Sequence, residues 1–352
     1  DIEKLDYTNL DNTELSEKLL VRYISQGTLW KMGNIFQLSV ELYDTKNKKV
    51  IWSDRWQEKW DNLPTIKGSL SDGLLQALNT KPKVELKVET TNPEAYEFLL
   101  KAKHKYEKRE NTDDVEIARG LLNKAIELDD NLILAKNLLG TTYREMGAYD
   151  KAMEIYSLAL TQAEELGDRC GMGHSLNNIG AVYGIKGDYE RALEYFNQSL
   201  EIKEEIGDKQ GIGNSFLNIG SMYKEKDDYD KALDYNSRSL AIAEDIGNRR
   251  GVGFCLNNMG IVHSIKGDYD KALDCYVRSL VIQEEIGNKH GIGSTLNNIG
   301  NLYFYKDDYD TALDYHGKSL AIQEEIGNKH GVAGSLANIG HAHWNKGDLD
   351  KA

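Results

Sequence analysis

The feature that most constrains this chain is a forty-residue pattern that recurs through its last two-thirds. A motif of the form Gly-Asp-Tyr-Asp-Lys-Ala-Leu begins at six positions spaced forty residues apart, namely Gly147, Gly187, Asp227, Gly267, Asp307 and Gly347. Self-similarity at a fixed period of this length is typical of proteins in which each structural repeat stacks only on its neighbours. One repeat must therefore explain most of the fold.

Each repeat contains two apolar patterns with helical spacing. In one repeat the first pattern includes Leu176 and Ile179, and the second includes Ala192 and Phe196. A Gly-Asp or Gly-Asn pair follows each pattern and supplies a left-handed end for one helix and an N-cap for the next. No proline follows Pro93 to interrupt these helices. The sequence predicts an uninterrupted array of helical hairpins.

Glycine recurs in the middle of each first helix, where it costs about 1 kcal/mol relative to alanine and needs a packing reason. These glycines are Gly180, Gly220, Gly260, Gly300 and Gly340. We expect the small residue of the second helix, Ala192 in one repeat, to face them, with an aromatic residue such as Tyr183 beside the contact. A side chain larger than alanine at Gly260 is expected to overpack this contact.

The residues at the expected helix contacts follow a known spacing. They are Leu176, Ile179, Gly180 and Tyr183 in a first helix and Ala192, Phe196 and Ser199 in the following second helix. This pattern resembles the tetratricopeptide repeat, in the forty-residue form of Pins-type polarity adaptors and kinesin light chains. The resemblance covers about residues 94–352 and implies a mainly α fold, a right-handed superhelix of about six and a half hairpins. Asn236 and His316 depart from it, because the family usually has an aromatic residue there.

The net charge limits the kinds of binding partner, and the cysteine content indicates the cellular compartment. Of the net charge of −14, residues 1–92 carry −1 and the remainder carries −13. Such a surface repels phosphate backbones and anionic lipids, so we expect neither nucleic acid nor a membrane as a partner. Cys170, Cys255 and Cys275 match no metal or redox motif, and so few thiols predict a reducing compartment, the cytoplasm. No apolar run is long enough to span a membrane.

The first ninety residues follow a different period. Residues 22–31 and 35–44 alternate between apolar and polar side chains across a short turn, and a third strand is expected from Val50. Helices are expected at about 12–20 and 63–78. We therefore expect a small α+β domain in residues 1–88 before a repeat array in residues 93–352.

Three stretches of this N-terminal region, residues 21–27, 38–44 and 52–56, are similar to the TolB-like domain that precedes tetratricopeptide repeats in many bacterial signalling proteins. The likeness covers about residues 12–80, and the family's first strand and helix are expected to be shortened or lost here. In that family a class III nucleotidyl cyclase or a winged-helix domain commonly lies upstream. The chain begins without methionine and ends in the first turn of an expected helix, so we expect it to be part of a longer protein.

Several short motifs have a plain structural interpretation. The Gly-x-Gly motifs, as at Gly171 and Gly173, follow a helix rather than a strand, which favours close helix packing over nucleotide binding. His341 and His343 are two residues apart and so do not share a helix face for a metal. Repeated acids such as Glu204 and Glu205 are expected on solvated faces, because catalytic carboxylates need unlike environments. The sequence therefore predicts no active site, metal or cofactor.

Asparagines recur on a different face of the first helices from the packed one. By the resemblance, this face lines the concave groove, where an amide can bind the backbone of an extended peptide. The expected groove residues are Asn177, Asn178, Asn218, Phe254, Asn257, Asn258, Asn297, Asn298, Asn301, Phe304, Tyr305, Asn338 and Trp344. The alternative is that the asparagines form a ladder between repeats that stabilises the stack without a ligand.

These observations predict a non-catalytic scaffold that binds a peptide or partner domain in the groove, as the regulatory region of a bacterial signalling protein. The partner domain can belong to the parent protein itself. Two alternatives remain open. One is a region that transmits signals to an upstream adenylate or guanylate cyclase domain. The other is a structural module that associates with itself.

Overall fold

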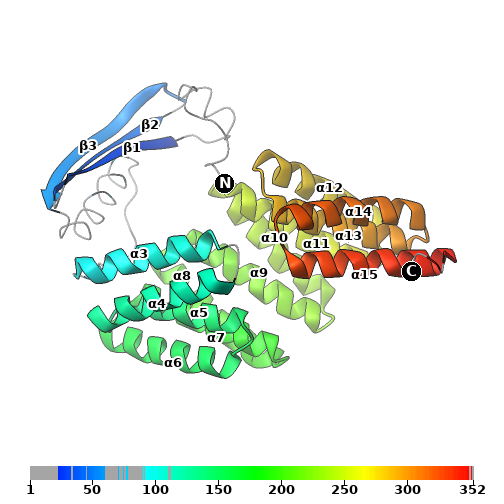
Figure 1. Cartoon of the computed structure of the whole chain (residues 1–352), viewed down its shortest axis with the longest axis horizontal. Coiled ribbons are helices and arrows are strands. Elements are labelled where there is room, and N and C mark those ends of the chain that lie inside the picture. The colour runs from blue at the N-terminus through cyan, green and yellow to red at the C-terminus, as the bar shows by residue number, and fades with distance from the viewer. Residues whose placement is uncertain are drawn as a thin grey trace. The chain divides into compact units, whose positions relative to one another are not determined.

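A computed structural model gives the fold of the chain (Figure 1). The structure describes residues 23–32, 35–44, 46–59, 70, 74, 77, 90, 92–109, 112–348 and 350. Within these residues a three-stranded sheet precedes thirteen helices. The predicted mainly α fold with a small N-terminal strand region is confirmed.

The N-terminal strands form an antiparallel meander in the order β1-β2-β3. They are β1 (Tyr23–Met32), β2 (Ile35–Asp44) and β3 (Lys49–Lys59). Alternate residues of β2, namely Phe36, Val40 and Leu42, are buried, so the sheet has one apolar face. The Asp44 carboxylate accepts the backbone N–H of Lys46 at 3.0 Å and closes the expected second turn. The three strands match the predicted ones.

The two helices expected beside the sheet fall largely outside the described residues. The helix expected at 12–20 lies wholly outside them. Of the helix expected at 63–78, only Leu70, Leu74 and Ala77 are described, and all three are helical.

The repeat region consists of consecutive antiparallel helices. They are α3 (Pro93–Glu107), α4 (Thr112–Leu128), α5 (Ile133–Glu145), α6 (Tyr149–Leu166), α7 (Arg169–Ile185), α8 (Tyr189–Ile206), α9 (Lys209–Glu225), α10 (Tyr229–Asp245), α11 (Arg249–Ile265), α12 (Tyr269–Glu285), α13 (Lys289–Tyr305), α14 (Tyr309–Glu325) and α15 (Lys329–Lys346). Odd-numbered helices are the first helices of hairpins and even-numbered helices the second. The described residues thus contain six hairpins and the first helix of a seventh.

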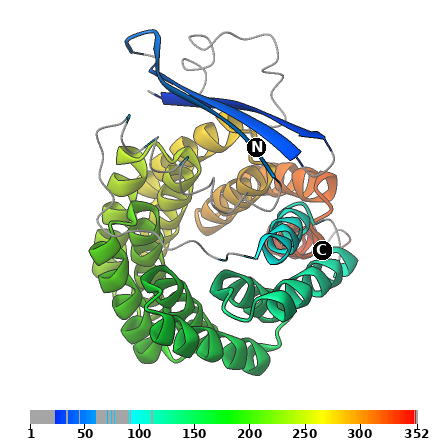
Figure 2. The ribbon, with the colours of Figure 1, turned by 90° about the vertical axis from the view of Figure 1, so that its left-hand side faces the viewer.

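The helices belong to two compact units that divide between Asp208 and Lys209. One unit contains α3–α8 and the other α9–α15. Within each unit a helix packs against its hairpin partner and against the next hairpin, so first and second helices form two layers (Figure 2). Each hairpin therefore buries its apolar face only by stacking on a neighbour.

Local signals at the turns match those in the sequence. Gly187 ends α7 with a φ of 80°, and the side chains of Asp188 and Asn288 each accept the backbone N–H three residues later. Asp227 and Asp307 take left-handed φ values of 58° and 59° where other repeats have glycine. Aspartate tolerates this conformation better than most residues but at a cost that glycine avoids.

One expected cap is missing. The carboxylate of Asp268 makes no capping hydrogen bond to α12. It lies instead 3.4 Å from both the Lys271 Nζ and the His263 Nδ1 atoms. The side chain that the sequence pattern places as a cap therefore points toward Lys271 and His263 instead.

The contact at the mid-helix glycines differs from the expected one. A Cβ atom at Gly260 would lie 2.5 Å from Cε1 of Tyr276, and one at Gly180 would lie 2.9 Å from Cδ1 of Phe196. Ala192 supplies only its backbone oxygen, at 3.2 Å from the Gly180 position. The glycine therefore makes room for the ring four residues after the alanine. Overpacking at Gly260 was expected for side chains larger than alanine, and the distance to Tyr276 indicates that alanine already overpacks it.

Buried serines account for the Gly-x-Gly motifs. In the second helices α8, α10, α12 and α14, the Oγ atom of one serine donates to the carbonyl of the second glycine in the preceding first helix, at 2.7–2.8 Å. The serines are Ser199, Ser239, Ser279 and Ser319. Because glycine has no side chain, the two helix backbones approach closely enough for this bond. This agrees with the interpretation that the Gly-x-Gly motifs serve close helix packing.

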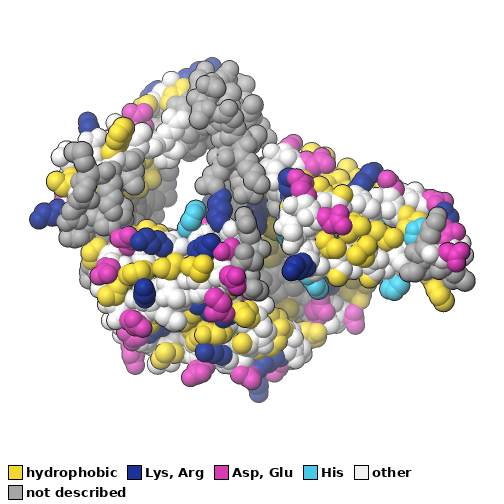
Figure 3. Space-filling view, viewed as in Figure 1, with side chains coloured by type: hydrophobic (Ala, Val, Ile, Leu, Met, Phe, Trp, Pro, Cys, Tyr) yellow, Lys and Arg dark blue, Asp and Glu magenta, His cyan; other side chains and the backbone are white. Residues whose placement is uncertain are grey.

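Exposed ion pairs join the ends of the helices, and acidic and basic side chains are interspersed over the face in Figure 3. Lys266 pairs with Asp230 of the preceding hairpin at 2.5 Å, and Arg249 pairs with Glu285 inside its own hairpin. Exposed pairs of this kind each contribute about 0–1 kcal/mol. The repeated acids are surface groups, as expected.

Candidate functional site

The candidate site is the face of the first helices that carries the recurrent asparagines. Direct contacts join α5 to α7 in one unit and join α11, α13 and α15 in succession in the other. No comparable contacts join successive second helices among the described residues. Because the first helices approach each other more closely, each row of hairpins curves with its first helices on the inner side.

Asparagine side chains on this inner face are hydrogen bonded from one repeat to the next. The Nδ2 atom of the later residue donates to the Oδ1 atom of an asparagine forty-one residues earlier. The pairs are Asn178 to Asn137 at 3.2 Å, Asn298 to Asn257 at 3.1 Å and Asn338 to Asn297 at 3.0 Å. This arrangement is the asparagine ladder that we considered as the alternative to ligand binding.

The accepting oxygens of the ladder are shared. The Oδ1 atom of Asn257 also accepts the Thr295 hydroxyl at 3.3 Å, and that of Asn137 accepts the Ser175 hydroxyl at 3.2 Å. Asn137 is almost fully buried and was not among the predicted residues. The forty-residue spacing from Asn137 to Asn177 is the signal that could have identified it.

The ladder has a gap in the C-terminal unit. Leu217 occupies the position that Asn257 and Asn297 hold in later repeats. Asn258, which lies forty-one residues after Leu217, is half-buried and has no hydrogen bond among the described residues. Asn301 is also half-buried without one. Both amides are thus unsatisfied at the surface of α11 and α13.

The two accepting residues of this unit also retain free donors. No acceptor for the Nδ2 atoms of Asn257 and Asn297 occurs within the part of the chain that the structure describes. Each lies on a half-buried side chain and is open to solvent, so it can donate a hydrogen bond to a ligand carbonyl. The ladder therefore fixes the orientation of the asparagines without using all their hydrogen-bonding groups.

Apolar side chains flank the asparagines near the C-terminal ends of the first helices. Tyr305 is 61% exposed and Trp344 is 66% exposed. Phe304 is half-buried and packs edge-on against both Tyr305 and Tyr309, at centroid distances of 6.1 and 5.6 Å. At the other end of α11, the half-buried Phe254 ring lies 5.6 Å from the Arg250 guanidinium. The structure thus brings aromatic and amide groups onto successive helices.

The remaining predicted residues, Asn177 and Asn218, are half-buried and belong to different units. Both take part in interactions. No predicted groove residue is completely buried.

His316 connects the ladder to the core. The side chain is completely buried in α14 against Gly300, and its Nδ1 atom lies 3.1 Å from Oδ1 of Asn297. Its Nε2 atom has no partner in the described structure. Burial lowers the pKa of His316 from 6.5 to about 4, because the charged imidazolium would lose its hydration. The ring is therefore neutral at pH 7.

Other chemistry is not evident in the described residues. They contain no group of three or more His, Cys, Asp or Glu side chains placed to hold a metal ion. Cys170, Cys255 and Cys275 are free thiols. Within the same residues no helix is long and apolar enough to cross a membrane.

The geometry defines an α-solenoid of stacked helical hairpins. The family model for the tetratricopeptide repeat matches residues 130–205, 211–285 and 291–352, and the chain belongs to this family. Comparison with curated proteins gave no match.

Solved structures share this fold at low sequence identity. The STAND protein PH0952 of Pyrococcus horikoshii, which has a tetratricopeptide repeat sensor, matches with a TM-score of 0.58 and 17% identity, over 82% of this chain and 44% of its own. Aspartyl phosphate phosphatase F of Bacillus subtilis matches at 0.53 and 16%, over 78% and 71%. A Rap protein complexed with competence and sporulation factor matches at 0.52 and 14%, over 81% and 82%.

Proposed function

We propose that this chain is a non-catalytic scaffold that binds an extended peptide or a partner domain along the inner face of its first helices. The observation that carries the proposal is the set of amide groups left unpaired in the C-terminal unit, at Asn257, Asn258, Asn297 and Asn301. An amide donor and acceptor can bond a peptide backbone independently of its sequence. The complex of a Rap protein with competence and sporulation factor supports this use of the fold.

The exposed aromatic residues supply the apolar part of such a site. Tyr305 and Trp344 each expose more than half of their surface, and buried aromatic contacts dominate the free energy of many interfaces. A ligand with apolar side chains beside a backbone held by the asparagines would cover them. Asn298 and Asn338 would orient the site through the ladder and contribute fewer direct contacts.

We further propose that the chain is the regulatory region of a bacterial signalling protein, with a TolB-like domain in residues 1–88 and the repeat array in residues 93–352. The three-stranded meander supports the first assignment. The partner can then be another domain of the same protein, including a nucleotidyl cyclase domain. Three free cysteines support a cytoplasmic location. Self-association is the competing role.

The experiment is selection of peptides from a random displayed library, followed by calorimetric titration of the selected peptides. The double variant Asn258→Ala plus Asn301→Ala is expected to weaken binding by about tenfold or more, because each side chain loses a hydrogen bond to the ligand. Neither residue has a hydrogen bond in the described structure, so stability should be retained. Unchanged affinity would remove these amides from the site.

Two controls accompany this titration. Asn197→Ala, on an exposed position of the second helix α8, is expected to leave affinity unchanged. Light scattering over a concentration series distinguishes a monomeric receptor from a self-associating module. A mass that rises with concentration, together with no selected peptide, would favour self-association.

A further inference from the structure

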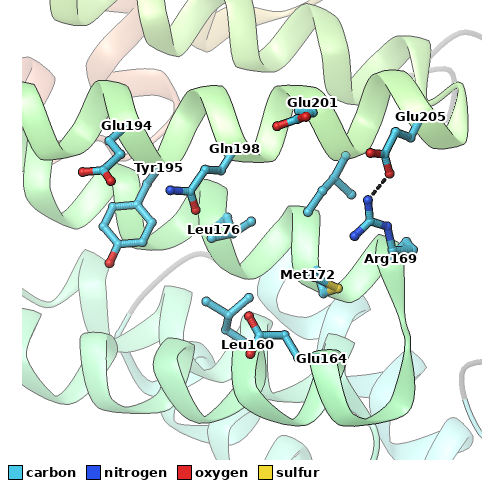
Figure 4. A pocket seen from close by; sticks show the side chains of 11 residues that line it. Leu160, Glu164, Arg169, Met172, Leu176, Glu194, Tyr195, Gln198, Glu201 and Glu205 are labelled. Carbon is cyan, nitrogen blue, oxygen red and sulfur yellow. Dashed lines mark hydrogen bonds and ion pairs between the residues drawn. The ribbon is translucent and has the colours of Figure 1, made fainter.

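A second surface feature lies in the N-terminal unit, away from the asparagine ladder. A pocket of about 480 Å³ opens between α6 and α8, with α7 as its floor (Figure 4). Its apolar lining comes from Leu160, Met172, Leu176 and Ile202. Its carboxylates are Glu164, Glu194, Glu201 and Glu205. It thus combines an apolar floor with an acidic rim.

The acidic rim is poorly neutralised by the protein itself. Arg169 is the one cation that lines the described pocket, and it is already paired with Glu205. Glu164, Glu194 and Glu201 have no ion pair among the described residues. Three uncompensated carboxylates therefore surround the opening.

The three repeats that follow α8 carry a cation at the position of Gln198, whereas the preceding helix α6 has Leu158. Lys318 lies 2.6 Å from the Asp314 carboxylate and 5.0 Å from the centre of the Tyr315 ring. Asp314 and Tyr315 lie three repeats after Glu194 and Tyr195 and occupy the equivalent positions in α14. A cation of the chain thus neutralises the acid and covers the aromatic face.

Each intervening repeat keeps one of these two contacts: Cys275 replaces the tyrosine beside Arg278, and no ion pair joins Arg238 to Asp234 among the described residues. Arg278 lies 3.4 Å from the Asp274 carboxylate, and Arg238 lies 5.2 Å from the centre of the Tyr235 ring. In α8 the equivalent residue is Gln198, which is neutral. Tyr195 stacks on Tyr183 as its equivalents stack on theirs, but no cation of the described residues lies over its ring.

A second difference in α8 also makes the pocket more negative. Glu201 lines the pocket where the following repeats have Ala241, Val281 and Ala321. Relative to the three following repeats, one change removes a cation and the other adds a carboxylate, so the local charge differs from theirs by two units. The aromatic and acidic partners of a cation remain, and the cation is absent.

We propose that this pocket binds a lysine or arginine side chain of a partner protein, next to an apolar residue of the same segment. The cationic group lies over Tyr195 between Glu194 and Glu201, in the position that Lys318 occupies in its own repeat. The apolar residue covers Leu160 and Met172. Charge complementarity and the apolar floor together select a basic amphipathic segment. This site is independent of the inner-face peptide site.

The test uses the full chain and a fluorescein-labelled probe peptide made of four Leu-Lys-Lys-Leu blocks, titrated by anisotropy at physiological salt. Gln198→Arg introduces the cation of the three following repeats and is expected to weaken binding by about tenfold, because it fills the site and repels the probe. Since Arg is the residue found at this position in two other repeats, the variant should fold. Equal affinity for wild type and Gln198→Arg would overturn the assignment.

The reciprocal variant guards against non-specific attraction to a chain of net charge −14. Lys318→Gln with Ala321→Glu reproduces the α8 residues in α14, and it is expected to add a second binding site for the probe. Gln198→Glu, which adds a further negative charge beside Glu194 and Glu201 instead of a cation, should strengthen binding. If affinity follows net charge alone, so that Gln198→Arg and the control Asn197→Arg at an exposed position weaken it equally, the pocket is not a site.

Discussion

The side-chain nitrogen of Asn298 lies 3.1 Å from the side-chain oxygen of Asn257, one repeat earlier in the chain. The two helices that carry them, α13 and α11, contact each other directly. This bond therefore depends on how the two hairpins are placed relative to each other, and not on the conformation within either hairpin. Its absence at Asn258 provides an internal comparison.

We expect Asn298→Ala to lower the free energy of unfolding of the C-terminal unit by about 1 kcal/mol, because a half-buried hydrogen bond is lost. Asn258→Ala, at the equivalent position without a partner, should change it by less than about half of that. Urea unfolding followed by circular dichroism measures both. Equal losses would mean that the ladder bond contributes nothing to stability.

Gly260→Ala is expected to destabilise the chain by about 1–3 kcal/mol, because its Cβ would lie 2.5 Å from a buried tyrosine ring. Gly220→Ala is the matched control. There the nearest atoms, the Ala232 oxygen and the Asn236 Nδ2, lie at 3.2 and 3.3 Å, and alanine gains about 1 kcal/mol of helix propensity. It should be close to neutral. The same urea titration tests the pair, and the reverse order would refute this account of the glycines.

Lowering the pH is expected to destabilise the fold through His316. Its pKa is about 4 in the folded protein and about 6.5 when exposed, so between these values the unfolded chain binds more protons. The stabilisation is complete above pH 6.5 and is lost as the pH falls toward 4. Between pH 7 and 5 this amounts to about 2 kcal/mol.

Chemical unfolding at several pH values, compared between the wild type and His316→Phe, isolates this contribution. Phenylalanine occupies the equivalent position as Phe196 and is fully compatible with the fold there. The difference in stability between the two proteins should grow as the pH falls. A difference that is constant with pH would exclude titration of His316.

Loss of the Asn288 cap is expected to be costly. Its side chain accepts the Gly291 backbone N–H and donates to Gln283 Oε1 at 2.6 Å, so Asn288→Ala should destabilise by about 1–2 kcal/mol. Asp268→Ala removes a residue at a helix start that makes no capping bond, and should cost less. Thermal unfolding distinguishes them. A larger effect at Asp268 would show that charge at the helix start matters more than the cap.

Much of the fold follows from local signals in the sequence. Helix ends at Gly187 and caps at Asp188 depend on backbone conformation and on hydrogen bonds within a few residues, so a pattern of residue types predicts them. The strands of the N-terminal meander follow in the same way from alternation. The irregularity in strand pairing between Leu42 and Tyr43 has no such local signal.

The contacts within and between repeats were harder to predict. Both Ala192 and Phe196 lie on the face of α8 that meets α7, and spacing alone does not say which of them meets Gly180. The direction of the Asn298 to Asn257 bond depends on how far α13 is shifted along α11, which only the three-dimensional packing determines. The role of Gln198 emerges only by comparison with the contacts of Lys318.

Copies of nearly the same sequence carry a risk, since a hairpin can pair with the wrong neighbour during folding. Because the asparagine ladder is interrupted, fewer of the possible pairings between hairpins are equivalent in energy. Asn258 follows Leu217 and forms no bond, whereas Asn298 and Asn338 each find a partner one repeat earlier. Such differences between repeats favour the native order of hairpins over other orders. If all the repeats were identical, several orders of stacking would have similar free energies, and the chain would have no single favoured fold.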